Sequence, residues 1–310
     1  MKIIFMGTPD YAAAALEALL EAGHEVTAVV TQPDRAKGRS GQVQCTPVKE
    51  CAVRHGIAVL QPVRVKAPEA VEELKKYEAD VYVVAAFGQI LSKEILALPR
   101  FGCVNIHASL LPKYRGAAPI NQCIIDGEQE TGVTIMQMDA GIDTGDILTQ
   151  KKVIIEDKET AETLFDKLSQ AGAALIVETL PMIERGEITP VKQDESLAGY
   201  VKMMDKSRGK IDWASDAVSI ERLVRGLNPW PSAYTSCQGK TVKIWRSDVV
   251  AAEAAQQPGT IVSVGKDFFD VACGSGNLRI YELQLEGKKR MDTKSFLLGN
   301  PWRAGMLLGV

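Results

Sequence analysis

The chain has 310 residues, a length that favours two compact domains with separate cores. Hydrophobic residues make up 46% and charged residues 24%, a composition of globular proteins that excludes disordered and fibrous classes. No apolar run reaches the roughly 20 residues of a membrane helix, and Pro9 and Asp10 interrupt the start, where a signal peptide would stay apolar. We therefore expect a cytoplasmic protein that does not enter a membrane.

The net charge of −3 is unevenly distributed along the chain. Residues 1–205 hold 21 Lys and Arg against 29 Asp and Glu, whereas residues 206–310 hold 15 against 10. A basic second part is typical of a surface that meets a polyanion, and an acidic first part is common among enzymes of small metabolites. Chance segregation of the charges is the alternative.

Short apolar runs alternate with helical patterns in the first half. The predicted strands are 2–6, 25–31, 79–86, 102–106, 132–138 and 146–155, and the predicted helices are 10–21, 117–126 and 161–185. Such alternation predicts an α/β fold with a doubly wound, mostly parallel, Rossmann-like sheet. Sheets of this kind bind ligands at the carboxyl ends of their strands.

The second half has a different pattern. After an aperiodic, charged stretch, a helix is predicted at 215–226 and short strands at 231–237, 241–250, 259–264, 268–273 and 277–285. Five short strands between Gly and Asp or Asn turns predict a small β-barrel similar to the oligonucleotide/oligosaccharide-binding (OB) fold. We predict a catalytic domain at 1–188, a linker at 189–212 and a barrel domain at 213–310.

Common cofactor motifs are absent from the sequence. Gly7 follows the first predicted strand without the further glycines of a dinucleotide fingerprint, which disfavours a nicotinamide cofactor, and no phosphate-binding loop for ATP is present. The six cysteines form no CxxC pair, so neither a zinc site nor a disulfide framework is predicted. We expect a protein without a metal.

The densest group of polar residues follows Cys103. Asn105 and His107 are two apart on a predicted strand, so their side chains project to one face near its carboxyl end. An amide can donate to a developing oxyanion and an imidazole can hold or pass a proton, so the pair suits attack on a carbonyl carbon. A structural role is the alternative for an isolated histidine.

A second polar cluster contains Asp139, Asp143 and Asp146 around two glycines. A compact turn of this kind could direct one carboxylate inward, although a solvated Asp-Gly loop is the commoner outcome. The spacing does not choose among the three aspartates.

The segments NIHASLLPKYRGAAPI and GVTIMQMDAGIDTGDIL resemble the signature of the 10-formyltetrahydrofolate-dependent formyltransferases. FMGTPDYAA, TQPDR and GLNPWPSAY extend the resemblance over the full length, toward the branch of the family that acts on initiator methionyl-tRNA. The resemblance implies transfer of a formyl group from 10-formyltetrahydrofolate to the methionyl amine, without a metal and without an obligate protein partner.

Residue roles follow from the same resemblance. It implies that Asn105 and His107 stabilise the oxyanion of a tetrahedral intermediate, and that Asp143 orients His107 and helps to move protons. It also implies a folate-contacting loop, which consists of Ser109, Leu110, Leu111 and Pro112.

Basic residues are the predicted contacts to tRNA phosphates. The segment 34–46 forms a basic loop whose family counterpart enters the tRNA acceptor stem, and Arg39 best matches the family's key arginine. The full set of predicted contacts is Arg35, Lys37, Arg39, Lys206, Arg208, Lys210, Lys288, Lys289 and Arg290.

Two other functions are weighed against this one. The chain could be a folate-dependent formyltransferase or hydrolase of a small metabolite, or a tRNA-binding module that has lost catalysis. The joint presence of Asn105, His107 and Asp143 disfavours a tRNA-binding module without catalysis. Binding that weakens steeply with salt would disfavour an enzyme of a small metabolite.

Overall fold

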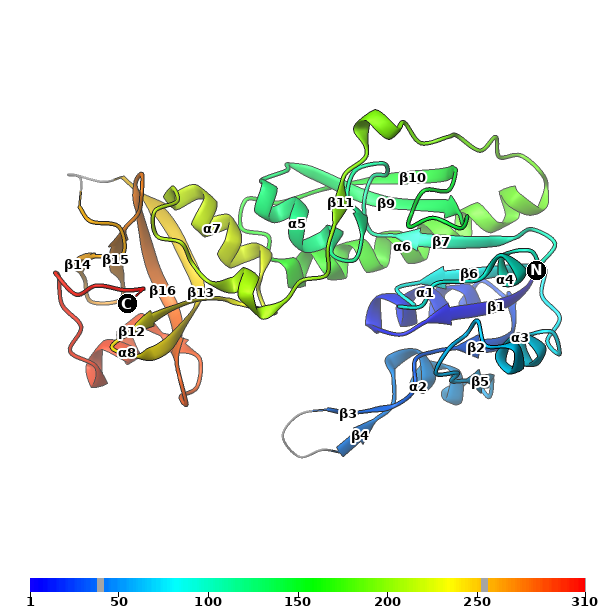
Figure 1. Cartoon of the computed structure of the whole chain (residues 1–310), viewed down its shortest axis with the longest axis horizontal. Coiled ribbons are helices and arrows are strands. Elements are labelled where there is room, and N and C mark those ends of the chain that lie inside the picture. Colours follow the sequence, from blue (N-terminus) through cyan, green and yellow to red (C-terminus); the bar gives the residue numbers. More distant parts are fainter. Residues whose placement is uncertain (38–41, 252–255, 310) are drawn as a thin grey trace. The chain divides into compact units, whose positions relative to one another are not determined.

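The computed structural model describes residues 1–37, 42–251 and 256–309 (Figure 1). The chain forms two compact units, which are described separately. The first unit comprises Met1–Pro119, Glu130–Ile154 and Phe165–Val201, and the second comprises Ile120–Gln129, Ile155–Leu164 and Lys202–Val310. Residues 120–129 and 155–164 thus belong to the second unit, although they lie inside the predicted domain 1–188. The domain boundaries at 188 and 212 stay a prediction.

A seven-stranded sheet forms the centre of the first unit, in the order β10-β9-β7-β6-β1-β2-β5 (Figure 1). The five strands from β7 to β5 pair in parallel, and β9 and β10 pair antiparallel. Their bounds are β1 Lys2–Gly7, β2 Glu25–Val30, β5 Ala58–Leu60, β6 Val81–Ala85, β7 Cys103–His107, β9 Glu130–Gln137 and β10 Ile147–Ile154. The predicted Rossmann-like, mostly parallel sheet is confirmed.

Six helices accompany these strands in the sequence. They are α1 Asp10–Glu21, α2 Pro47–Arg54, α3 Pro68–Leu74, α4 Lys93–Leu96, α5 Pro119–Asp126 and α6 Ala161–Glu184. The helix α1 spans the predicted residues and buries Tyr11, Ala15, Leu16 and Leu19 at a helical spacing. No helix in the described ranges combines the length and apolar character that crossing a membrane requires.

A short hairpin occupies the segment expected as a basic loop. β3 Arg35–Lys37 pairs antiparallel with β4 Gln42–Gln44. Its base is fixed by the carboxylate of Asp34, which accepts hydrogen bonds from Lys49 Nζ at 2.5 Å and Gln61 Nε2 at 2.7 Å. The hairpin therefore starts from an anchored point of the first unit.

The part of the predicted linker that precedes residue 202 packs on the first unit. It contains the 3₁₀ helix η1 Glu195–Leu197 and β11 Tyr200–Val201, which pairs in parallel with β8 Arg115–Gly116. We call residues 191–201 the strap. This pairing is not evident from the sequence, because the strap has no apolar period.

The second unit is built on an antiparallel sheet in the order β12-β13-β16-β15-β14, with β17 paired to β16. The bounds are β12 Ala233–Cys237, β13 Lys240–Val250, β14 Ile261–Val264, β15 Phe269–Ala272, β16 Asn277–Leu285 and β17 Met291–Asp292. The C-terminal segment connects the two edges, since Leu308 N donates to Gly259 O and Gly309 N to Ser236 O, each at 2.8 Å. This closure is consistent with the predicted small barrel.

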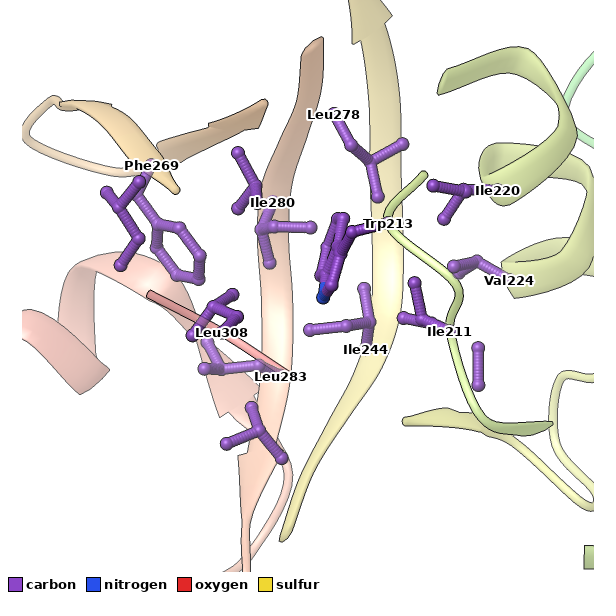
Figure 2. Close-up of a cluster of buried hydrophobic side chains, with 14 of the residues drawn as sticks. Ile211, Trp213, Ile220, Val224, Ile244, Phe269, Leu278, Ile280, Leu283 and Leu308 are labelled. Atoms are coloured by element: carbon purple, nitrogen blue, oxygen red, sulfur yellow. The ribbon is translucent and has the colours of Figure 1, made fainter. Parts of the chain in front are cut away.

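The core of the second unit surrounds Trp213 (Figure 2). The indole is 5% exposed, and its Nε1 donates to Thr235 Oγ1 at 3.0 Å. The helix α7 Ala217–Gly226 contributes Ile220 and Val224, and its first turn is capped by Asp216, which accepts from Ser219 N. Burial of each large apolar side chain contributes about 1.5–3 kcal/mol. The remaining elements are η2 Lys206–Gly209 and α8 Thr293–Gly299.

Candidate active site

The strand β7 (Cys103–His107) carries Asn105 and His107 on one face, because the two residues are two apart in the strand. Both are nearly buried, with 9% and 6% of their surface exposed. A buried polar side chain needs partners, because an unsatisfied group loses its hydration without compensation. The partners found at this strand end form the candidate active site.

The ring of His107 is held by a backbone carbonyl. Its Nε2 lies 2.9 Å from Tyr114 O, and because a carbonyl only accepts, Nε2 carries the hydrogen of this bond. Its Nδ1 lies 3.6 Å from Asp143 Oδ2, beyond hydrogen-bond distance. A hydrogen on Nδ1 could therefore bond to a bound oxygen or, after a small shift, to the carboxylate.

Asp143 is the aspartate of its loop that reaches these two side chains. Its Oδ1 accepts from Asn105 Nδ2 at 3.4 Å, and its Oδ2 accepts from Gly116 N at 2.8 Å. Asp139 instead accepts from Gly141 N and Thr144 Oγ1 at an exposed position. The tertiary structure thus makes the choice that the sequence spacing left open.

Three consecutive residues, Tyr114, Arg115 and Gly116, surround His107 and Asp143. Tyr114 has a φ of 59° and Gly116 a φ of 102°, both in the left-handed region. A Cβ atom at Gly116 would come within 2.4 Å of Val201 O. Glycine is therefore needed where β8 meets β11 and where the backbone N–H turns toward Asp143.

The strap reaches the same loop through Gln193. Its Nε2 donates to Asp143 O at 2.8 Å and to Gly145 O at 2.7 Å, and its Oε1 accepts from Arg115 Nε at 2.9 Å. Arg115 and Gln193 were not predicted as site residues. A basic residue inside the motif and a glutamine in an aperiodic stretch carry no signal for such a contact.

The predicted folate loop is a turn with inward-facing side chains. Ser109 is fully buried and its hydroxyl donates to Lys113 O at 2.7 Å, while Leu111 is 3% exposed and its N–H donates to Thr134 Oγ1. Gln150 Nε2 donates to Leu111 O at 2.9 Å. Leu110 and Pro112 stay half-buried and are the members of this loop that a ligand could meet.

The predicted tRNA contacts lie on both units. Arg35 is exposed at the start of β3, Lys37 ends that strand, and Arg39 lies outside the described residues. In the second unit the exposed contacts are Lys206, Arg208 and Lys210 at η2, and Lys288, Lys289 and Arg290 before β17. Arg290 is already paired with Glu282, and its guanidinium lies 4.8 Å from the Trp245 ring centre.

One group of side chains in the described part of the chain could offer three ligands to a metal. It consists of Glu17, Cys51 and His55, whose ligand atoms lie within 4.8 Å of one another. They already bond to each other, with Cys51 Sγ 2.8 Å and His55 Nε2 2.9 Å from the carboxylate. Burial, with a further contribution from Glu17, raises the pKa of the Cys51 thiol to about 12. The absence of a metal stays a prediction.

Comparison with known proteins defines the class of this enzyme. Residues 1–180 match the family model described as Formyl transferase, and residues 203–301 match the one described as Formyl transferase, C-terminal domain. Together the two matches cover both units and identify a formyl-transferring enzyme.

Full-length relatives narrow the class to one family. A protein of Lachnospira eligens is 56% identical over 100% of both chains, and one of Agathobacter rectalis is 54% identical over 96% of both. Each is named methionyl-tRNA formyltransferase. The chain belongs to the methionyl-tRNA formyltransferase family, which confirms the resemblance found in the sequence.

Solved structures share the fold at much lower identity. The sugar 3N-formyl transferase WlaRD is 20% identical with a TM-score of 0.68, covering 93% of this chain and 99% of that one. HypX from Aquifex aeolicus is 18% identical with a TM-score of 0.65, covering 97% of this chain and 49% of that one. These likenesses support the fold alone.

Proposed function

We propose that this enzyme transfers the formyl group of 10-formyltetrahydrofolate to the amino group of methionine on an initiator tRNA, in the cytoplasm. The observation that carries the proposal is the 56% identity over the full length to a relative named methionyl-tRNA formyltransferase. The charge balance agrees with it, since the basic part of the chain is the part after residue 205.

The reaction exchanges one C–N bond for another. The unprotonated methionyl amine attacks the formyl carbon, and the bond from that carbon to N10 of the folate breaks. The amine gives up a proton and N10 gains one, so no net proton is consumed. Negative charge develops on the formyl oxygen between these events, and the protein must stabilise it.

Asn105 is the proposed donor to that oxygen. An amide nitrogen carries two hydrogens, and within the described residues Asn105 Nδ2 makes one hydrogen bond, to Asp143. The second hydrogen is available to an oxyanion at the end of β7. The bond to Asp143 fixes the plane of the amide before substrate arrives, which is the condition for preorganised stabilisation.

His107 and Asp143 are the proposed proton-handling pair. The bond from Nε2 to Tyr114 O leaves Nδ1 facing Asp143 Oδ2 at 3.6 Å. A hydrogen on Nδ1 would meet either the formyl oxygen or the carboxylate. Asp143 stabilises the charged ring when a proton is held there, and water can relay protons from the attacking amine.

The loop 109–112 is the proposed folate contact. Its turn is fixed from the inside by Thr134 and Gln150, so the half-buried Leu110 and Pro112 would present apolar surface to the pteridine-bearing donor. The hydroxyl of Ser109 is already bonded to Lys113 O and would act by holding the turn. This arrangement fits a flat, partly apolar ligand.

The proposed tRNA contacts are the nine basic residues of the hairpin, η2 and the turn before β17. Lysine and arginine at exposed positions bind phosphates and contribute little to sequence choice. Glu282 competes with RNA for Arg290, so we expect Arg290 to contribute less than Lys288 and Lys289.

One assay tests the proposed function. The protein is incubated with 10-formyltetrahydrofolate and with methionine-charged initiator tRNA, methionine-charged elongator tRNA or a free amino sugar nucleotide, and formyl incorporation is measured at several salt concentrations. We expect incorporation into the initiator tRNA that falls steeply as salt rises. Preferential formylation of the amino sugar nucleotide, with little salt dependence, would overturn the proposal in favour of a small-metabolite enzyme.

A further inference from the structure

We infer that Gln193 is a positioning residue for Asp143, and that the buried Arg115 fixes the orientation of its amide. The inference rests on the proposed role of Asp143 in formyl transfer and concerns the strap, which the sequence analysis treated as a linker. No role in catalysis by contact with substrate is assigned to either residue.

The hydrogen bonds of Gln193 identify the oxygen and the nitrogen of its side-chain amide. Arg115 Nε can only donate, so the atom 2.9 Å from it is the carbonyl oxygen of Gln193. The other end faces two backbone carbonyls, Asp143 O at 2.8 Å and Gly145 O at 2.7 Å, so it is the NH₂ group. Every polar atom of the amide is thereby used, and a flipped amide would lose all three bonds.

Arg115 is an unusual anchor because its side chain is fully buried. It donates through Nη2 and Nη1 to the two oxygens of Glu195 at 2.8 and 3.0 Å, and also to the Tyr200 hydroxyl at 2.9 Å. The guanidinium is planar, so the bonds from its two Nη groups to these three acceptor oxygens also fix the direction of its Nε–H. That N–H points at Gln193 Oε1. The hydrogen bond from Arg115 holds the pKa of Glu195 below its usual range, so the pair stays charged at a lower pH than a free glutamate would.

Asp143 needs such support because of its backbone conformation. Its φ of 53° lies in the left-handed region, which a residue other than glycine adopts at an energetic cost. Gly116 N holds the carboxylate and Gln193 holds the carbonyl of the same residue. The adjacent residues 115 and 116 therefore fix Asp143 from two sides, one through Gln193 and the other directly.

A purely structural role for Gln193 would be to provide an acceptor for the buried Arg115. The two roles separate in the variant Gln193→Glu, because a carboxylate still accepts from Arg115 Nε but cannot donate to the carbonyls of Asp143 and Gly145. Gln193→Ala removes both functions. A positioning role predicts that the Glu variant loses turnover under conditions in which it is still fully folded.

The test compares kcat, KM and thermal stability in the full-length protein. We expect Gln193→Glu to lower kcat about 10- to 100-fold with KM for both substrates within about twofold, since a displacement of about 1 Å has effects of this size. Gln193→Glu should stay folded at the assay temperature, with a melting temperature lowered because its carboxylate faces two carbonyl oxygens, whereas Gln193→Ala should lose kcat together with the acceptor for Arg115. Wild-type kcat in Gln193→Glu would overturn the inference.

Gln150→Ala is the matched comparison, because Gln150 Nε2 also donates to two oxygens, Leu111 O of the loop 109–112 and Thr134 Oγ1 of β9. Its loss should appear in KM for the formyl donor. If Gln150→Ala lowers kcat as much as Gln193→Glu and leaves KM unchanged, the effect does not come from Asp143 and the inference fails.

A double-mutant cycle separates this inference from the proposed function. In an Asp143→Asn background, Gln193→Glu should change kcat by less than about twofold, because residues that act as a unit are not additive. Additive losses would overturn the inference alone. Wild-type turnover by Asp143→Asn itself would overturn the proposed role of Asp143 and the inference together.

Discussion

The Nδ1 atom of His107 lies 3.6 Å from the Oδ2 atom of Asp143, although 36 residues separate them in the sequence. His107 ends β7, and Asp143 lies in the loop from β9 to β10. The strand β9 pairs antiparallel with β7 and ends at Gln137 opposite Val104, so the loop after β9 starts beside β7. Hydrogen bonds from Asn105 Nδ2 and Gly116 N then hold the Asp143 carboxylate near His107. The pairing of these two strands therefore assembles the candidate site.

The contact between Asp143 and the β7 side chains predicts a large effect of Asp143→Asn. Asparagine tolerates the left-handed φ, so the loop should keep its course while the charge that faces His107 is lost. We expect kcat to fall by about 10²–10⁴-fold, the usual range for loss of general acid–base assistance. Asp139→Asn is the matched control, because that exposed aspartate of the same loop makes only local bonds to Gly141 and Thr144 in the described structure. Similar losses in both variants would show that the loop, and not the carboxylate of Asp143, is what matters.

The second prediction concerns Asn105. Loss of one oxyanion donor typically costs about 10²–10³ in rate, so Asn105→Ala should lose turnover to this extent. The side chain makes one hydrogen bond in the described structure, to Asp143, so the fold and tRNA affinity should be preserved. Steady-state kinetics, circular dichroism and a tRNA-binding titration on the same sample provide the measurement. Wild-type transfer by this variant would remove Asn105 from the mechanism.

Some of this architecture was readable from the sequence for a physical reason. The strands β1 and β6 are apolar runs buried on both faces, and α1 has apolar residues along one side, so local composition decides their structure. The short strand β5 and the helices α2 and α3 lack a long enough pattern. They acquire their structure from tertiary contacts, which the sequence does not display.

The candidate site was readable only in part. Asn105 and His107 share a face because strand residues alternate, and that argument needs no tertiary information. Asp143 was identified by family resemblance, because the local sequence does not distinguish it from the other two aspartates within the same eight residues. The contribution of Gln193 could not be found, because it depends on the buried Arg115 and on pairing between β8 and β11.

The third prediction concerns pH and the contact between α1 and α2. The pKa of Glu17 is lowered chiefly by the hydrogen bond from Cys51 Sγ and further by that from His55. A carboxylate with a depressed folded-state pKa stabilises the fold above its unfolded pKa, and this contribution is lost as the pH falls through the folded value. The difference in unfolding free energy between wild type and Glu17→Gln should therefore be largest near neutral pH and should shrink below about pH 4.3.

Urea unfolding at a series of pH values measures this difference. Glu21→Gln, on the same helix and with no hydrogen bond to its carboxylate in the described residues, is the control and should shift the unfolding midpoint little at any pH. A Glu17→Gln effect that grows toward acid pH would contradict the assignment of the shift to these hydrogen bonds.

The last prediction concerns Arg39, which lies outside the described residues, between the two strands of the hairpin whose base is fixed by Asp34, Lys49 and Gln61. Its proposed partner is the tRNA acceptor stem, and the proposed folate contact is the separate loop 109–112. Loss of a phosphate or base-edge contact costs roughly 1–3 kcal/mol, and loss of a phosphate contact also reduces the salt slope by about one. Arg39→Ala should therefore depress tRNA formylation strongly and leave formyl-donor affinity, measured by calorimetry, unchanged. Arg185→Ala, which removes an exposed arginine paired with Glu187, is the matched control and should formylate tRNA as the wild type does. An equal loss of formyl-donor binding in Arg39→Ala would mean that the hairpin shapes the folate site, and full formylation would mean that this arginine is only a solvated surface charge.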